Sequence, residues 1–339
     1  MTKISVIMPV YNTKPIYLKQ AIESILNQTF EDFKFLILND SPENKIITNI
    51  INNYQDKRIF YYENSTNKGI ARSYNHLLSL VDTKYVALMN HDDISLPKRL
   101  ETQYDYLENN PEIGLIGTAY KKFGEINRFK NIYPVKTDAE IRTLLFFKSP
   151  IHHPTIMLRN QIVTQHKILY NENYVSLNDR YFYYDFCKYS KLGNLDKVLY
   201  KYRFHKDMTS KKQKDRILEE QRNFHKFWLQ DNGINLHQYE MDVLDNYALH
   251  GRCRIKNKEN LCYIRNILEK LVLENQKKHF LPENEFKNIC AEYLIKRSLN
   301  AAWYGHIQTK YILEQTTLPI KSMPLLQVLD LVNNWRDRN

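Results

Sequence analysis

The chain is poor in the residues that several folds and sites require. Its 339 residues include only 8 glycines, which argues against an all-β barrel with many tight turns and favours a helix-rich α/β or α fold. Its four cysteines stand far apart and form no CxxC pair. This spacing argues against a disulfide framework and a cysteine-based zinc site, and it indicates a reducing compartment. The cysteines are Cys187, Cys253, Cys262 and Cys290.

Long apolar runs and blocks of like charge are missing as well. No stretch reaches the roughly 18 uncharged apolar residues that a membrane span needs, and the apolar run near Met1 is too short for a signal peptide. We therefore expect a cytoplasmic protein with peripheral contact to the inner face of a membrane. The net charge of +11 attracts anionic headgroups or nucleotide diphosphates. Because that charge is spread out and no nucleic-acid motif is present, we expect no nucleic-acid partner.

Strand and helix patterns alternate over the first 90 residues. We expect strands at 4–10, 33–39, 58–62 and 84–90, and helices at 15–28, 43–55 and 70–81. This order is typical of an α/β fold with a parallel sheet and helices on both faces.

The rest of the chain predicts a second region that is helical. Further strands are expected at 113–123, 155–158 and 197–203, and helices at 97–109 and 180–190. Beyond about 211 only helical apolar stripes follow, such as Leu261, Ile264, Leu268 and Leu271. We therefore expect a catalytic domain at 1–210 and a helical C-terminal region at 211–339.

Polar residues follow three of the expected parallel strands. The clusters are Pro9–Asn12, Asn39–Ser41 and Asn90–Asp93. Ligands of such sheets bind beyond the carboxyl ends of the strands, and carboxylates there can hold Mg²⁺ or Mn²⁺ together with substrate phosphates. The alternative for Asp92 and Asp93 is a helix N-cap.

Several motifs stand in an order that resembles one family. They are Ser5–Asn12, Ala21–Phe30, Asn39–Asp40, Asn67–Asn75, Met89–Leu100, His153–Arg159 and Tyr202–His205. As a set, over about residues 1–206, they resemble the family-2 glycosyltransferases of the GT-A fold. The resemblance implies a Rossmann-like, mainly parallel sheet flanked by helices, and transfer of a sugar from a nucleotide-sugar donor.

The resemblance also implies which residues hold the donor. Pro9, Val10 and Tyr11 would lie along the uridine, and Asp40 would hydrogen-bond the base. The family's DxD motif falls on Asn90, His91 and Asp92, so that Asp92 would bind Mn²⁺ or Mg²⁺. Asn90 replaces the usual aspartate and can offer the donor ribose only an amide.

Two further positions match residues near the nucleotide, and each has an alternative. Arg72 could instead be an exposed basic residue, and Asn75 a helix-surface amide. His205 matches a histidine that could reach the metal or the diphosphate. His152 and His153 fall near the expected acceptor side, although a lone histidine is more often structural.

The catalytic base is expected at Asp179. The family's Glu-Asp pair falls on Asn178 and Asp179, so only the aspartate survives; Asp185 is the second choice. The alternative is that Asp179 caps the following helix.

These residues predict an inverting glycosyltransferase. The hypothesis is transfer of an N-acetylhexosamine or hexose from a UDP-sugar to a hydroxyl of a glycan or glycolipid, such as bacterial lipooligosaccharide. Ser149–His152 and residues 170–205 carry a narrower likeness to lipooligosaccharide β-1,3-N-acetylglucosaminyltransferases. The alternatives are a galactosyl or glucosyl transferase of capsule or O-antigen synthesis, and a catalytically silent nucleotide-sugar-binding partner, because acidic residues are missing at 90 and 178.

Overall fold

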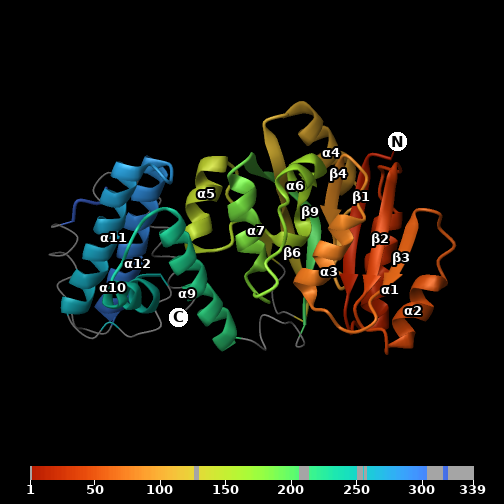
Figure 1. Cartoon of the computed structure of the whole chain (residues 1–339), viewed down its shortest axis with the longest axis horizontal. Helices are drawn as coiled ribbons and strands as arrows, with labels where there is room; N and C mark the ends of the chain where they lie inside the picture. Colours follow the sequence, from red (N-terminus) through yellow and green to blue (C-terminus); the bar gives the residue numbers. More distant parts are fainter. Residues whose placement is uncertain are drawn as a thin grey trace. The chain divides into compact units, whose positions relative to one another are not determined.

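The computed structural model describes residues 2–125, 130–205, 214–249, 255, 258–303 and 316–319. The chain divides into two compact units (Figure 1). Unit 1 comprises residues 1–141 and 149–220, and unit 2 comprises residues 142–148 and 221–339. The expected domain boundary at 210/211 stays a prediction.

Within the described part of unit 1, nine strands form one mixed sheet. The order is β3-β2-β1-β4-β8-β6-β9-β5, and β7 pairs with β6. The strands are β1 (Ile4–Val10), β2 (Phe33–Asn39), β3 (Ile59–Glu63), β4 (Tyr85–Leu88), β5 (Ile94–Ser95), β6 (Ile113–Gly124), β7 (Asn131–Ile132), β8 (Met157–Arg159) and β9 (Lys191–Phe204).

The first four strands of this order run parallel and carry the polar clusters. In register, Ile7 of β1 lies between Leu36 of β2 and Leu88 of β4. All seven residues of β1 are buried, as expected for a central strand covered on both faces. The carboxyl ends of these strands therefore meet at one edge of the sheet.

Helices cover the sheet of unit 1 and connect its strands. On α1 and α2, Ile22 and Ile50 join a core cluster with Val6 and Met8 of β1. Because neighbouring residues of a strand point to opposite faces, Ile7 is left to the other face. The helices are α1 (Pro15–Leu26), α2 (Lys45–Asn52), α3 (Ile70–Ser79), α4 (Arg99–Asn109), α6 (Asn160–His166) and α7 (Asn178–Cys187), with a 3-10 turn at His153–Thr155. Helix α5 (Asp138–Phe147) begins in unit 1, and its residues from 142 on belong to unit 2.

The expected α/β class followed by a helical region is confirmed, but some details differ. Helices α5 and α6 and the short strands β5 and β7 were not predicted from the sequence. Strand β9 begins at Lys191, six residues before the expected strand at 197. Its early part, with Gly193 and Asn194, lacks the β-branched and aromatic pattern that marks a strand, and pairing with β6 holds it extended.

Unit 2 is helical in its described residues. Its elements are the later part of α9 (Lys214–Asp231), α10 (Gln238–Val243), a π-helical turn (Leu244–Leu249), α11 (Lys258–Lys278) and α12 (Glu283–Trp303). The expected stripe on α11 is buried core, with Leu261, Ile264 and Leu268 fully inaccessible. Among the residues that the structure describes, no helix is long and apolar enough to cross a membrane.

A buried histidine ties residues 142–148 into unit 2. His225 of α9 is fully buried, and its Nδ1 lies 2.6 Å from Oδ1 of Asp245, which is equally buried. Its Nε2 lies 3.0 Å from the carbonyl oxygen of Phe146 at the end of α5. Both ring nitrogens thus face oxygen atoms, one from the π-helical turn and one from α5, and hold these elements together.

Candidate active site

The three polar clusters lie together at the carboxyl edge of the parallel strands. The backbone N–H of Asp40 donates to the carbonyl oxygen of Val10 at 2.8 Å, and that of Met89 donates to Ile7 at 3.0 Å. Beyond β1, Tyr11 is 48% exposed, while Pro9 and Val10 are buried. The cluster after β4 reaches back to β1, because Nδ1 of His91 lies 3.2 Å from the carbonyl oxygen of Pro9.

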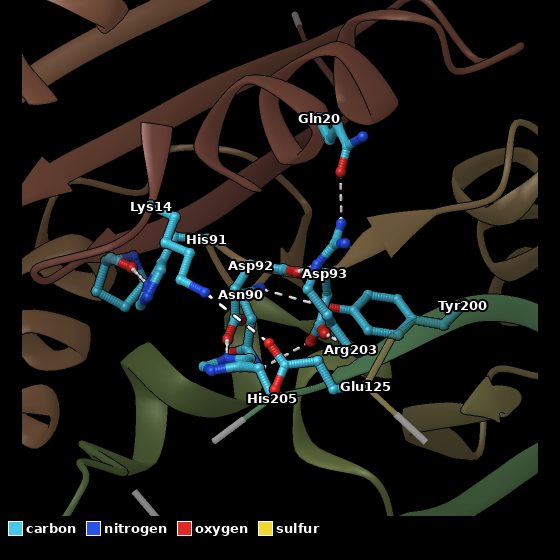
Figure 2. Close-up of polar contacts among 11 residues, drawn as sticks. Lys14, Gln20, Asn90, His91, Asp92, Asp93, Glu125, Tyr200, Arg203 and His205 are labelled. Carbon is cyan, nitrogen blue, oxygen red and sulfur yellow. Dashed lines mark hydrogen bonds and ion pairs between the residues drawn. The ribbon is translucent and has the colours of Figure 1, made fainter. Parts of the chain in front are cut away.

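The structure brings together the two residues that the sequence proposes as metal ligands. Oδ2 of Asp92 lies 2.9 Å from Nε2 of His205, although the two residues are 113 positions apart (Figure 2). Asp92 follows β4, and His205 directly follows β9. Both side chains are mostly buried, at 20% and 11% exposed.

The chemistry of this pair fits a divalent cation held jointly with a substrate. A carboxylate oxygen and an imidazole nitrogen suit Mn²⁺, and Mg²⁺ is commonly held by one or two carboxylates plus substrate phosphates. Within the described ranges, no group of three or more histidine, cysteine or acidic side chains could hold a metal by itself. Asp92 and His205 would therefore supply only part of a coordination shell.

Asp93 has a different environment from its neighbour Asp92, and its hydrogen bonds hold the turn at residues 90–93 in place. It is fully buried, and its carboxylate accepts hydrogen bonds from the Tyr200 hydroxyl at 2.9 Å, the Arg203 backbone N–H at 2.7 Å and the Asn90 amide at 3.0 Å. Burial, together with the nearby charge of Asp92, raises the pKa of Asp93 well above its ordinary value. These bonds fasten the turn after β4 to β9.

The helix-cap alternative for Asp92 and Asp93 is wrong. The residues after them form β5, and the next helix, α4, has Lys98 as its N-cap. Asp93 caps no helix. The three hydrogen bonds that it accepts join the turn after β4 to β9.

Arg203 fixes the backbone of Asp92. Its Nε donates to the Asp92 carbonyl oxygen at 2.6 Å, and its second guanidinium nitrogen donates to Oε1 of Gln20 at 2.6 Å (Figure 2). The guanidinium also lies 4.2 Å from the ring centre of Tyr17 and 4.4 Å from that of Phe123. This stacking is favourable for a desolvated cation, and burial lowers the pKa of Arg203.

Asp93→Ala is expected to destabilise the fold more than Asp92→Ala. The substitution leaves the buried hydroxyl of Tyr200, the N–H of Arg203 and the amide of Asn90 without their acceptor, at about 1–3 kcal/mol for each unsatisfied group. Chemical denaturation should show a loss of at least about 3 kcal/mol for Asp93→Ala and little change for Asp92→Ala. Equal midpoints for the two variants would contradict the anchoring role.

Asp40 holds the loop that leads into α3. Its carboxylate accepts hydrogen bonds from the Asn64 amide at 2.7 Å and from the backbone N–H groups of Lys68 and Gly69 at 2.8 and 2.9 Å. Gly69 has φ of +85°, which only glycine adopts without strain. Asp40 thus orders this loop, and its contact with a nucleotide base stays a prediction.

Arg72 and Asn75 both contact the segment between α6 and α7. Nε of Arg72 donates to Glu172 at 2.8 Å in an exposed ion pair. The Asn75 amide donates to the carbonyl oxygen of Tyr170 at 3.0 Å and accepts from its N–H at 2.8 Å. The predicted nucleotide contacts of Arg72 and Asn75 are untested, but their side chains organise residues 170–172.

Asp179 lies in the first turn of α7. Its carboxylate accepts hydrogen bonds from the Ser149 hydroxyl at 2.9 Å and from the Arg180 backbone N–H at 2.8 Å. Leu177, and not Asp179, occupies the N-cap position of the helix. Desolvation raises the pKa of Asp179. The second choice, Asp185, is about half exposed and pairs with Lys188 at 3.1 Å.

Tyr74 of α3 is an almost fully buried tyrosine of unit 1. Burial is the main cause that raises the pKa of its phenol. The charges of Asp93, Asp92 and Asp179 raise this pKa further, and the charge of Arg99 lowers it.

His152 and His153 are partly buried and pack against aromatic side chains. Burial lowers the pKa of each to about 3. The His152 ring stacks on Tyr120 with 4.0 Å between centroids, and Nδ1 of His153 lies 2.8 Å from the Tyr183 hydroxyl. A neutral imidazole does not act as a general acid at neutral pH, and the position of both histidines near the acceptor stays a prediction.

Sequence reasoning assigned no role to several residues that shape the site. Arg203 and Ser149 stand within motifs that carried the resemblance, but the sequence alone does not show which residues they contact. Gln20 and Tyr200 stand in an expected helix and an expected strand, but only the approach of α1 and β9 to the turn at 90–93 makes them part of the site.

Comparisons with known proteins agree with this geometry. The family model "Glycosyl transferase family 2" matches residues 5–167. The chain is 38% identical over 209 residues to an uncharacterized glycosyltransferase of Methanocaldococcus jannaschii, covering 59% of this chain and 70% of the relative. It is 29% identical over 213 residues to the O-antigen biosynthesis glycosyltransferase WbnJ of Escherichia coli, covering 61% of this chain and 82% of the relative. The chain therefore belongs to glycosyl transferase family 2.

Solved structures share the fold at low sequence identity. Staphylococcus aureus TarS 1–349 in complex with UDP-GlcNAc has a TM-score of 0.61 and 15% identity, covering 90% of this chain and 93% of that one. A Pyrobaculum calidifontis mannosyltransferase in complex with GDP-Man and Mn²⁺ has a TM-score of 0.53 and 12% identity, covering 89% and 87%. These likenesses confirm the GT-A type of fold expected from the sequence.

Proposed function

We propose that the chain transfers a sugar from a UDP-sugar, with inversion at the anomeric carbon, to a hydroxyl group of a bacterial surface glycan or glycolipid. The observation that carries this proposal is the 2.9 Å contact between Asp92 and His205, which places a carboxylate and an imidazole suited to a divalent cation beyond the carboxyl ends of the parallel strands. A cation-binding pair and a carboxylate base are what a metal-assisted displacement requires.

Asp179 would act as the general base. Its carboxylate takes the proton of the acceptor hydroxyl while the hydroxyl oxygen forms a bond to the anomeric carbon. The bond from that carbon to the diphosphate oxygen breaks, and its electron pair leaves with UDP. One displacement from the opposite face gives a β product from an α-linked donor. The Ser149 hydroxyl, 2.9 Å from the Asp179 carboxylate, holds the base in place.

Asp92 and His205 would hold Mn²⁺ or Mg²⁺. When bound, such an ion neutralises negative charge on a diphosphate leaving group. Arg203 and Asp93 keep the two ligands together, because Arg203 holds the Asp92 backbone and Asp93 holds β9, the strand that His205 directly follows.

Two classes of sugar are supported by different comparisons. N-acetylglucosamine is favoured by the UDP-GlcNAc complex of the similar fold and by the narrower likeness of residues 149–152 and 170–205. A galactosyl or glucosyl transferase of O-antigen synthesis is the second candidate, because an O-antigen glycosyltransferase is among the relatives. A silent sugar-nucleotide-binding protein would bind the donor without turning it over.

UDP is expected to bind more tightly than GDP or ADP in the presence of Mn²⁺. A uracil ring is smaller than a purine, and Asp40 stands at the strand end where the base is expected. Calorimetry with the three nucleotides, followed by thermal shifts with a panel of UDP-sugars, checks the donor class. Equal affinity for all three nucleotides would contradict the UDP assignment, and binding without UDP release would favour the silent protein.

A further inference from the structure

A buried glutamate far along the chain holds the segment that precedes Asp179. Glu220 of α9 is 4% exposed. Its carboxylate accepts hydrogen bonds from three consecutive backbone N–H groups: Val175 at 3.0 Å, Ser176 at 2.8 Å and Leu177 at 3.1 Å. Nε of Arg216, one helical turn earlier, also donates to it at 2.9 Å.

These three N–H groups belong to the N-cap residue of α7, Leu177, and to the two residues that precede it. A carboxylate near the first turn of a helix also interacts favourably with the helix dipole. Glu220 therefore fixes, from outside the segment, the backbone that leads into α7.

The same segment is fastened at its other end by Asn75. Through the two hydrogen bonds between its amide and the backbone of Tyr170, Asn75 fixes the chain just after α6. Residues 171–174 thus run between two fixed points, and the one held by Glu220 is next to Asp179. The backbone of Leu177 is only two residues from the carboxylate that we assign as the base.

We propose that Glu220 is a positioning residue for Asp179, an inference that rests on the proposed function of Asp179 as general base. By fixing three N–H groups ahead of α7, Glu220 sets the direction in which the first turn of the helix presents the base. A displacement of a reacting group by about 1 Å can lower a rate by about 10²-fold. Glu220 would thus affect sugar transfer without contacting either substrate.

Glu220→Gln is the decisive variant, because it keeps the size of the side chain and removes one acceptor oxygen. The glutamine amide presents N–H groups to backbone N–H groups, so at least one of the three loses its partner. Exchange of the Val175–Leu177 amides with deuterium should become faster, while exchange in β1 stays unchanged. The kcat for UDP release from UDP-N-acetylglucosamine, with octyl glycosides as acceptors, should fall by about 10–100-fold, and the KM for the donor should hardly change.

Two neighbours on α9 provide matched controls. Glu219→Gln changes an exposed side chain of the same type, and Arg216→Gln removes the ion pair but leaves the three backbone contacts of Glu220. Both should retain the wild-type kcat and amide exchange. If Arg216→Gln matched Glu220→Gln in both readouts, the ion pair and not the backbone contacts would be responsible, and the proposal would be overturned.

The double variant Asp179→Asn/Glu220→Gln separates this inference from the proposed function. If Glu220 acts through Asp179, the double variant should be no slower than Asp179→Asn, because residues that act as a unit are not additive. An equal further loss in the Asp179→Asn background would overturn the positioning role. Normal turnover of Asp179→Asn alone would instead overturn the base assignment. Faster deuterium exchange of the 175–177 amides in Glu220→Gln would, even then, show that Glu220 fixes this backbone segment.

Discussion

Asp92→Ala is expected to abolish sugar transfer and the Mn²⁺ dependence of UDP binding, while the thermal midpoint hardly changes. The Asp92 side chain contacts His205 but does not take part in the buried hydrogen bonds that Asp93 accepts, so its removal leaves the sheet intact. A bound cation can contribute several kcal/mol of charge stabilisation, which corresponds to a loss of about 10³-fold or more in rate.

Calorimetry of UDP with and without Mn²⁺ measures the binding effect independently of turnover. Glu125→Gln is a suitable control, because Glu125 is an exposed carboxylate that pairs with Lys14 at 3.9 Å near the same site (Figure 2). That variant tests whether loss of any negative charge near the site lowers the affinity for the cation. Wild-type turnover that survives EDTA would show that the metal role of Asp92 and His205 is incorrect.

Asp179→Asn is expected to lower kcat by about 10²–10⁴-fold, since this is what general-base catalysis usually contributes. The amide has nearly the same shape but cannot take the acceptor's proton. Donor affinity should change little, because the proposed role of Asp179 concerns the acceptor. Asp185→Asn is the control, and normal turnover of Asp179→Asn beside an inactive Asp185→Asn would move the base to Asp185.

The same substitution should change the pH profile in a defined direction. Desolvation raises the pKa of Asp179 above the ordinary value of about 3.9, and only the ionised carboxylate acts as a base. Wild-type kcat should therefore rise with pH through a midpoint above that value, and this limb should disappear in Asp179→Asn. Because folding favours the protonated form, ionised Asp179 costs stability at neutral pH, and Asp179→Asn should unfold no more easily than the wild type.

Local sequence patterns were sufficient for the parallel part of the fold. The uninterrupted apolar run of β1 and the helical repeat of α1 lie where the sequence predicts them, because burial on two faces or along one stripe leaves a short-range periodic signal. The same reasoning failed for the early part of β9, which is a strand through its pairing with β6. Its own residues give no such signal.

The sequence also determined which residues to examine, since Asp92, Asp179 and His205 stand in recognisable motifs. Only the tertiary structure decided what they contact. Asp92 meets His205 across 113 residues because β9 pairs with β5, immediately after the turn that carries Asp92. Likewise, Glu220 meets the beginning of α7 from 43 residues away at its nearest contact. A carboxylate gives the same local sequence pattern whether it binds a cation, joins two strands or holds the backbone ahead of a distant helix. Its role depends on which backbone and side-chain groups the tertiary structure brings against it.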